Sequence, residues 1–322
     1  MKQSSIPAKP KPQLKDSTVV GTSFLVSISD VVINATMALI TGSVVMLSQA
    51  LQGSSDLLTT GLLYRGVKAS RRQRDDKHHF GYGRELFFWV IIAGVFMFFG
   101  TGMLSLFFGA RQFLNPQPLD DIELAMVVLV ISFVANAYAF SLSVRRLKRY
   151  AGVAHWWKKA ATSSLIETKS TFLIDLLGTL AAVMGFIALG LFLVTGDARF
   201  DGLGGLSIGI CMMIGSSLII LDVKGLIVGR AVSKDVAQQI NIAALAVDHV
   251  ERVLDLRTTY IGSDKLLIII ELHLRDALQT DDIERVSDIV KQQIKQAVPQ
   301  ATIIQVEVET PDEELSRLHI TG

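Results

Sequence analysis

The sequence is poor in the residues on which most catalytic and nucleic-acid-binding sites depend. Its 322 residues include one cysteine and six histidines, and the formal net charge is only +1. A single cysteine excludes an intramolecular disulfide and a thiolate metal cluster, and a balanced charge gives no field that would attract nucleic acid. The sequence also contains no phosphate-binding loop, nucleophile–base arrangement or zinc-hydrolase motif. We therefore expect a protein that is not an enzyme and binds no nucleic acid.

Charged residues are scarce as well, whereas long apolar runs are plentiful. The chain is 50% hydrophobic and 19% charged, with a mean hydropathy of +0.44, which is too apolar for an ordinary soluble protein. A helix that spans a bilayer needs about 20 apolar residues. Six runs of about this length or more fall at 17–41, 43–67, 86–110, 121–144, 161–194 and 202–227. The sequence therefore predicts an integral membrane protein with six transmembrane helices.

The basic residues of the short connections predict how these helices are oriented. The connections after the second and fourth runs are rich in Lys and Arg: Arg65, Lys68, Arg71, Arg72, Arg74, Lys77 and Arg84, then Arg145, Arg146, Lys148, Arg149, Lys158 and Lys159. The other turns offer only Arg111 and Arg199. Because Lys and Arg accumulate on the cytoplasmic side, both termini are predicted to be cytoplasmic. Residues 1–16 are polar and are expected to form a disordered tail, without a secretory signal peptide.

Two of the apolar runs contain an aspartate, Asp56 or Asp175. A charged side chain at membrane depth costs about 3 kcal/mol on insertion scales, so such residues usually face a bundle interior or an ion pathway. Two of them in separate runs suggest one shared cation site. Asp30 in the first run is a third acid, for which the sequence leaves a structural role and a place on the pathway equally open.

Beyond Arg230 the composition becomes that of a soluble domain. Alternation and helical periodicity predict a helix at 234–247, strands at 253–262 and 265–275, a helix from Thr280 and a last strand at 301–309. The apolar face of the second helix is predicted to consist of Ile283, Val286, Ile289, Val290 and Ile294. The expected fold is a membrane bundle at 17–230 followed by a cytoplasmic α+β domain of αββαβ order at 231–322.

This organisation resembles the cation diffusion facilitator family of divalent-metal transporters. The stretch GSVVMLSQALQGSSD (42–56) aligns without a gap on the family's second-span signature, which usually ends in His-x-x-x-Asp, and VLDLRTTYIGS (253–263) resembles its first cytoplasmic strand. HHFGYGRELFFW (78–89), RFDGLGGLSIGI (199–210) and GLIVGRAVSKD (225–235) look most like the zinc-transporter-9-like branch. The resemblance implies efflux of a divalent cation, coupled to protons, by a homodimer in a bacterial inner membrane. The cytoplasmic domain would serve dimerisation.

The family's transport site takes two residues, spaced i and i+4, from each of the second and fifth spans. The matching positions here are Gln52 and Asp56, then Thr171 and Asp175, so an amide and a hydroxyl stand where histidines are common. Glu167, two turns before Asp175, is a further candidate ligand. Imidazole suits zinc, whereas oxygen donors suit harder ions, so Zn, Mn, Fe and Co are all candidate transported ions, and no other cofactor is expected. Gln52 and Thr171 are alternatively polar packing residues between helices.

A weaker candidate metal site lies in the basic connection after the second run. Some relatives carry an acid there, a histidine three residues later and another four beyond that; Asp75 and His78 match, but Tyr82 replaces the second histidine. A solvated charged loop is the alternative. Two other functions stay open: a transport-silent subunit that assembles with an active relative, and a membrane-tethered metal sensor. Two intramembrane charges favour transport over both.

Overall fold

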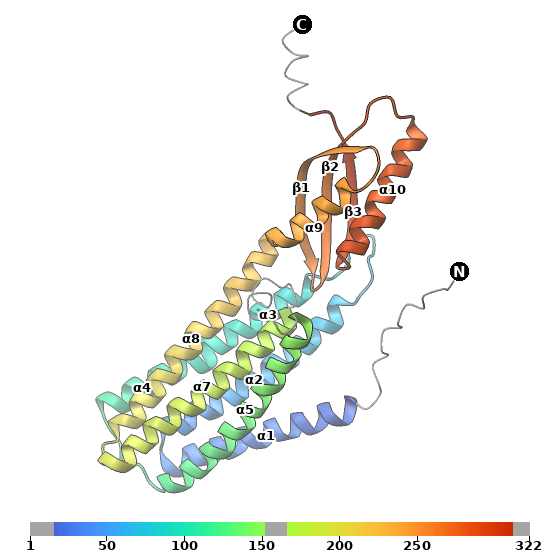
Figure 1. Cartoon of the computed structure of the whole chain (residues 1–322). Coiled ribbons are helices and arrows are strands. Elements are labelled where there is room, and N and C mark those ends of the chain that lie inside the picture. Colours follow the sequence, from blue (N-terminus) through green and yellow to red (C-terminus); the bar gives the residue numbers. More distant parts are fainter. Residues whose placement is uncertain (1–15, 152–165, 312–322) are drawn as a thin grey trace.

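A computed structural model describes residues 16–151 and 166–311, and of residues 16–26, 149–151 and Glu167 it describes only the backbone. Residues 1–15 of the predicted tail lie outside this range. The described chain forms an elongated helical bundle with a small α+β domain beyond the C-terminal end of helix α8 (Figure 1).

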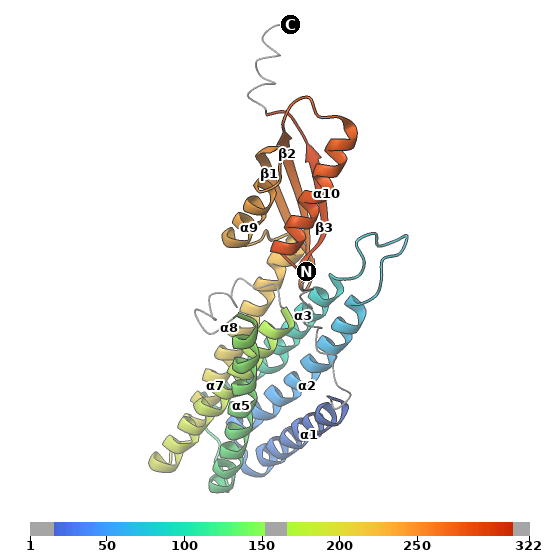
Figure 2. The ribbon, with the colours of Figure 1, turned by 45° about the vertical axis from the view of Figure 1, so that its right-hand side comes forward.

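Long, roughly parallel or antiparallel helices make up the bundle. They are α1 (Asp16–Thr41), α2 (Val44–Ser70), α3 (Glu85–Phe96), α4 (Leu104–Leu114), α5 (Ile122–Ala151), α7 (Ile166–Thr195) and α8 (Arg199–Val228). A π-helical turn, η1 (Met97–Met103), joins α3 to α4 without a break. Figure 2 shows α1 at the edge of the bundle beside α2.

Within the described residues, four helical segments are long and apolar enough to cross a membrane. They are Glu85–Leu114, Ile122–Lys148, Thr168–Thr195 and Arg199–Val228. This confirms the predicted helical membrane region. In α1 the described apolar stretch, Ser27–Thr41, is shorter. Polar side chains such as Gln49, Gln52 and Asp56 lower the hydropathy of α2, although these three face the interior of the bundle or a cavity rather than its outer surface.

The start of α2 is fixed by a carboxylate from a neighbouring helix. Asp201, in the first turn of α8, is fully buried and accepts hydrogen bonds from the Ser43 hydroxyl at 2.5 Å and from the backbone N–H groups of Val44 and Val45 at 2.8 and 3.0 Å. The first N–H groups of a helix have no partner within the helix and carry a partial positive charge. Asp201 therefore satisfies this helix end and joins α2 to α8.

Helices α4 and α8 approach each other closely through glycines. A Cβ at Gly109 would lie 2.5 Å from the Leu206 nitrogen, and one at Gly202 would lie 2.5 Å from the Phe113 nitrogen. Small residues at such spacing allow close backbone packing in membranes, where lipid gives no hydrophobic drive for helices to associate. The pair α4–α8 is thereby a tightly packed unit of the bundle.

The α+β domain contains α9 (Lys234–Leu245), β1 (Val250–Gly262), β2 (Lys265–Leu274), α10 (Thr280–Ala297) and β3 (Ala301–Val308). The sheet order is β1-β2-β3, with β1 antiparallel and β3 parallel to β2. Alternate residues of β2 are buried, and Val286, Val290 and Ile294 of α10 pack into the same core. The predicted member Ile289 is instead 40% exposed, because it lies at the flank of this stripe.

The described parts of the bundle and of the α+β domain meet at the end of α8 and at the loop before α3. Helix α8 ends at Val228 and is capped by Gly229, whose φ of +112° suits glycine, and the chain then enters the α+β domain. The loop before α3 also touches the β1–β2 hairpin, since a Cβ at Gly83 would lie 2.3 Å from the Ile261 carbonyl oxygen. Only glycine allows so close an approach of the two backbones.

Candidate functional site

The intramembrane acids Asp56 and Asp175 line the same cavity. It has a volume of about 430 Å³ and is bounded by residues of α1, α2, α5 and α7. Helix α2 contributes Gln52 together with Asp56, and α7 contributes Thr171 together with Asp175. Side chains four residues apart lie on the same face of a helix. The packing of α2 against α7 therefore brings both pairs to one space.

Gln52 is tied to Asp56 within this cavity. The Gln52 side chain is 3% exposed, and its Nε2 donates a hydrogen bond to Asp56 Oδ2. Gly178 on α7 leaves room for the amide, because a Cβ there would lie 2.8 Å from Gln52 Nε2. The hydrogen bond orients the amide nitrogen toward the acid.

Asp175 has a different partner, and it lies near a second acid. The buried Ser143 hydroxyl on α5 donates to Asp175 Oδ2. Asp56 and Asp30 line the same cavity as Asp175. Like charges in one low-dielectric space repel each other, so the arrangement favours a bound cation.

The other two predicted ligands are Thr171 and Glu167, and the structure describes the side chain of only the first. Thr171 lines the cavity one turn before Asp175. The backbone of Glu167 belongs to α7, but its side chain lies outside what the structure describes. Its role as a ligand stays a prediction.

Further polar residues also line the cavity, among them Asp30 and Asn136, and the sequence had pointed to only one of these two. Asp30 of α1 is the acid whose role was open. Asn136 of α5 was missed, although its Oδ1 lies 2.7 Å from the position that a Cβ on Gly178 would take. An amide inside an apolar span is costly unless it has a partner, and that signal could have singled out Asn136.

The donor set determines what the cavity could bind. Among the described residues, no three His, Cys, Asp or Glu side chains gather closely enough to hold a metal ion. An ion at this place would therefore combine the carboxylates of Asp56 and Asp175 with amide and hydroxyl oxygens, such as those of Gln52 and Thr171. Such oxygen donors suit hard divalent cations better than soft ones.

The sequence patterns of two protein families match the chain. That of the cation efflux transmembrane domain matches residues 21–226, and that of the cation efflux protein cytoplasmic domain matches residues 232–309. The chain belongs to the cation efflux family. This is the family of the cation diffusion facilitators, as the resemblance predicted; it consists of membrane transporters of metal cations rather than enzymes.

Several members of this family are similar to the chain at modest identity. The human mitochondrial proton-coupled zinc antiporter SLC30A9 is 26% identical over 275 residues, which cover 85% of this chain and 47% of the relative. The magnetosome protein MamB of Magnetospira sp. (strain QH-2) is 24% identical over 294 residues, covering 90% of this chain and 94% of the relative. A nickel form of a MamM CTD variant covers 24% of this chain and 98% of its own, with 18% identity and a TM-score of 0.23. The chain spans less than half the length of the SLC30A9 relatives.

In this cation efflux protein, the second candidate site is a loop closed by its own hydrogen bonds. Asp75 Oδ1 accepts from the backbone N–H of Lys77 at 3.1 Å and of His78 at 2.8 Å, and it lies 3.3 Å from His78 Nδ1. The Tyr82 hydroxyl donates to Asp75 Oδ2 at 2.6 Å, and it holds the pKa of that carboxyl below its ordinary value. Arg72 lies over the Tyr82 ring, 4.4 Å from its centre.

A charged cluster connects α7 to the end of α8. Lys169 Nζ lies 2.8 Å from Asp222 Oδ2, and Arg230 Nη1 lies 2.6 Å from Asp222 Oδ1. Among the described residues, Asp222 of α8 is thus an ion-pair partner of Lys169 of α7. Spacing could not reveal the pair because the two residues are far apart in the chain.

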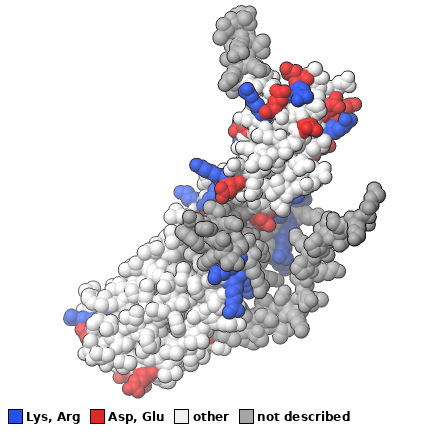
Figure 3. Space-filling model, in the orientation of Figure 1, with Lys and Arg blue, Asp and Glu red and all other residues white. Residues whose placement is uncertain are grey.

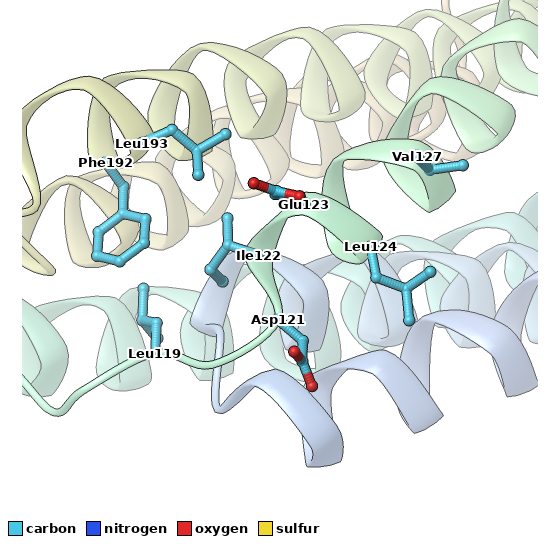
Figure 4. A pocket seen from close by; sticks show the side chains of 8 residues that line it. All are labelled: Leu119, Asp121, Ile122, Glu123, Leu124, Val127, Phe192 and Leu193. Atoms are coloured by element: carbon cyan, nitrogen blue, oxygen red, sulfur yellow. The ribbon is translucent and has the colours of Figure 1, made fainter.

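A larger hollow at the opposite end of the bundle has no comparable arrangement. It measures about 770 Å³ and lies between the start of α5 and the end of α7. Its acids, Asp121 and Glu123, point in different directions, while Phe192 and Leu193 form an apolar side (Figure 4). The smaller cavity is lined by acids from three helices, so it is the better candidate for a cation site.

Proposed function

We propose that this protein exports a divalent metal cation from the cytoplasm through the cavity between α1, α2, α5 and α7. Asp56, Asp175, Gln52 and Thr171 bind the ion there, and Glu167 assists. The single observation that carries this proposal is the meeting of both i, i+4 pairs, from α2 and α7, in one cavity with two carboxylates. Two carboxylates neutralise one divalent ion and supply oxygen donors for it.

The oxygen-rich donor set favours a hard ion. Manganese and ferrous iron accept carboxylate, amide and hydroxyl oxygens readily, whereas zinc gains more from imidazole. Zinc and cobalt remain substrates of the same site at lower preference. SLC30A9 is named as a zinc antiporter, and histidine is common in the family where this chain has Gln52 and Thr171.

Six helical segments would span the membrane, with both termini in the cytoplasm. They are α1, α2, the continuous segment α3–η1–α4, α5, α7 and α8. On the face shown in Figure 3, Lys and Arg gather where the bundle meets the α+β domain, and most of the described bundle surface is uncharged. Positive residues mark the cytoplasmic side, so the α+β domain at 231–322 lies there. The transmembrane part is 17–230, and the membrane is the bacterial inner membrane.

Export is driven by exchange for protons, and the working unit is a homodimer. The name of SLC30A9 includes proton coupling. With no histidine among the described lining residues, the exchanging groups here are carboxyls. The cytoplasmic domain, which matches that of the family, holds two copies together.

Reconstitution tests the proposal. Purified protein in proteoliposomes is given Mn, Fe, Co, Zn or Cd ions with and without a pH gradient, and the uptake of each ion is recorded. We expect uptake of at least one ion, stronger with the gradient, and a preference for Mn or Fe. An absence of uptake for every ion would contradict export and favour a transport-silent subunit or a membrane-tethered sensor.

A further inference from the structure

We propose that Thr101, in the π-helical turn η1, is a positioning residue of the ion site and sets the direction in which Gln52 and Asp56 of α2 point. This inference deepens the proposed function and rests on it, since it concerns the same site. The Thr101 side chain is fully buried. Its hydroxyl donates a hydrogen bond to the Leu51 carbonyl oxygen at 3.0 Å and lies 2.6 Å from the Ser55 hydroxyl oxygen. Both partners belong to α2.

The direction of these hydrogen bonds follows from the single hydrogen of each hydroxyl group. Thr101 uses its hydrogen for the Leu51 carbonyl, so Ser55 is the donor in the contact between the two hydroxyls. A serine in a helix can instead donate to the carbonyl four residues earlier, as Ser54 does to Ala50 at 2.8 Å. For Ser55 that acceptor would be Leu51, whose carbonyl is bound by Thr101. Both bonds of Thr101 therefore connect η1 to α2.

The cavity acid of α2 differs from those of α1 and α7 in where its hydrogen-bond donor lies. The Ser132 hydroxyl of α5 donates to Asp30 of α1 at 2.6 Å. The Ser143 hydroxyl of α5 donates to Asp175 of α7. These two bonds hold α1 and α7 to α5 at the level of the cavity. Among the described residues, the donor to Asp56 is instead a residue of α2 itself, so this bond does not orient α2 relative to the other helices.

The hydrogen bonds of Thr101 restrain the rotation of α2 about its own axis. Leu51 and Ser55 each directly precede a residue of the cavity lining, and successive residues of an α-helix lie about 100° apart around the axis. A rotation of about 20° would move side-chain atoms that lie about 5 Å from the axis by about 2 Å. Binding groups need to be held within about 0.5 Å of their productive positions. Thr101 therefore keeps Gln52 and Asp56 directed at the cavity.

The π-helical turn η1 is itself held in place by α8. A Cβ at Gly102 would lie 2.6 Å from Met213 Cγ and 3.2 Å from the Met213 nitrogen, so the backbone of η1 packs directly on α8. Met97, at the start of η1, is buried. Single π-helical turns within α-helices are rare and occur frequently at functional sites. In η1 the neighbouring residues Thr101 and Gly102 contact two different helices, so α2 is oriented against α8 through this turn.

The test compares Thr101→Val, which removes the hydroxyl and keeps the branched shape, with Thr101→Ser, which keeps the hydroxyl. Thr59→Val and Ser54→Ala are the matched controls on α2. Thr59 is buried and its hydroxyl has no hydrogen-bond partner among the described residues, and Ser54 donates to the backbone of its own helix. The measurements are KM and the maximal rate of Mn²⁺ and Zn²⁺ uptake in proteoliposomes, and binding of both ions to the detergent-purified full-length protein by calorimetry.

The expected result is a change in ion binding that depends on the hydroxyl at position 101. Thr101→Val should raise KM and weaken binding about ten-fold, because two hydrogen bonds that orient the ligands are lost. The maximal rate should stay within about two-fold of the wild type. Thr101→Ser should restore binding to within about two-fold, and both controls should bind and carry the ions like the wild type. A role in packing alone would lower the melting temperature of Thr101→Val and leave KM unchanged.

Two outcomes overturn the inference, and they are distinguishable. If Thr101→Val has the wild-type KM while Asp56→Asn carries neither ion, the export site stands and Thr101 does not position it. If the wild type carries neither ion, or if Asp56→Asn carries both as the wild type does, the proposed site fails and this inference fails with it. Should Thr101→Val not fold, Ser55→Ala decides. Its loss of one of the two hydrogen bonds should raise KM about three-fold, and an unchanged KM overturns the inference.

Discussion

Asp56 lies within α2 and Asp75 in the loop that follows it, and the two carboxylates differ in exposure and in hydrogen-bond partners. Asp75 is exposed and receives hydrogen bonds from the Lys77 and His78 backbone and from Tyr82. Asp56 faces a cavity, where Gln52 is its donor and where Asp30 and Asp175 also belong to the lining. The carboxylate of Asp75 already accepts hydrogen bonds from its own loop. The carboxylate of Asp56 shares its cavity with two other acids, Asp30 and Asp175, and a cation or a proton there would offset their mutual repulsion.

The comparison teaches that an acid of suitable spacing is not sufficient for a metal site. The loop keeps Asp75 and His78 at the spacing of a metal site, yet Tyr82 fills the place of a third ligand with a hydrogen-bond donor. In the bundle, Gln52 also replaces a histidine, but its amide carries an oxygen as well as the donor nitrogen. Substitutions in the two regions should therefore affect ion movement very differently.

The largest expected effect separates the two acids directly. Asp56→Asn or Asp175→Asn should lower the initial rate of metal uptake by about 100-fold or more, because each removes a charged ligand from a site with few of them. Asp75→Asn should leave the rate within about two-fold of the wild type, since surface changes of this kind are usually small. Uptake in proteoliposomes measures all three variants. Undiminished uptake by Asp56→Asn or Asp175→Asn would sink the site assignment.

A second change tests whether the amide and hydroxyl positions contact the ion. Gln52→His combined with Thr171→His places two imidazoles in the cavity, and imidazole is the better zinc ligand. The ratio of zinc to manganese uptake should rise about ten-fold. Gln49→His is the control, because Gln49 is buried on the same helix but does not line the cavity. An unchanged ratio in the double variant would mean that these positions do not coordinate the ion.

The smallest effect concerns the closed loop. The Tyr82 hydroxyl is the main cause of the lowered pKa of Asp75, so Tyr82→Phe should raise that pKa toward its ordinary value. A lowered folded-state pKa contributes stability above the unfolded-state pKa, and this contribution is lost as the pH falls through the folded-state pKa. The variant should lose most of that contribution, with no effect on uptake. NMR titration of labelled aspartate measures the shift.

Tyr64→Phe provides the control for this titration, because Tyr64 is an exposed tyrosine on α2. It should leave the pKa of Asp75 unchanged. If Tyr82→Phe also leaves the pKa of Asp75 unchanged, the hydrogen bond from the Tyr82 hydroxyl does not cause the lowered pKa. The contrast between Asp56 and Asp75 would then need another explanation.

Local spacing predicted some of these features and missed others for identifiable reasons. The i, i+4 pairs of α2 and α7 follow from helical periodicity, as does the alternating burial of β2. The cavity between α1, α2, α5 and α7 does not follow from periodicity. Periodicity shows which face of a helix is polar, but not which other helix that face contacts. Asn136 and Ser132 are single polar residues in an apolar span, and their importance depends on neighbours from α1 and α7. The pairing of Lys169 with Asp222 is likewise a contact between distant parts of the chain.

The hydrogen bonds of Asp201 to the first turn of α2 have a mechanical consequence. They fix one end of the helix that carries Asp56, so a tilt of α2 would pivot about that end. With a rise of about 1.5 Å per residue, Asp56 lies about 18 Å from this pivot and Ser70 about 39 Å. A tilt of about 10° would then move Asp56 by about 3 Å and Ser70 by about 7 Å. The end of α2 that carries Ser70 would then move more than Asp56, while the end held by Asp201 would stay still.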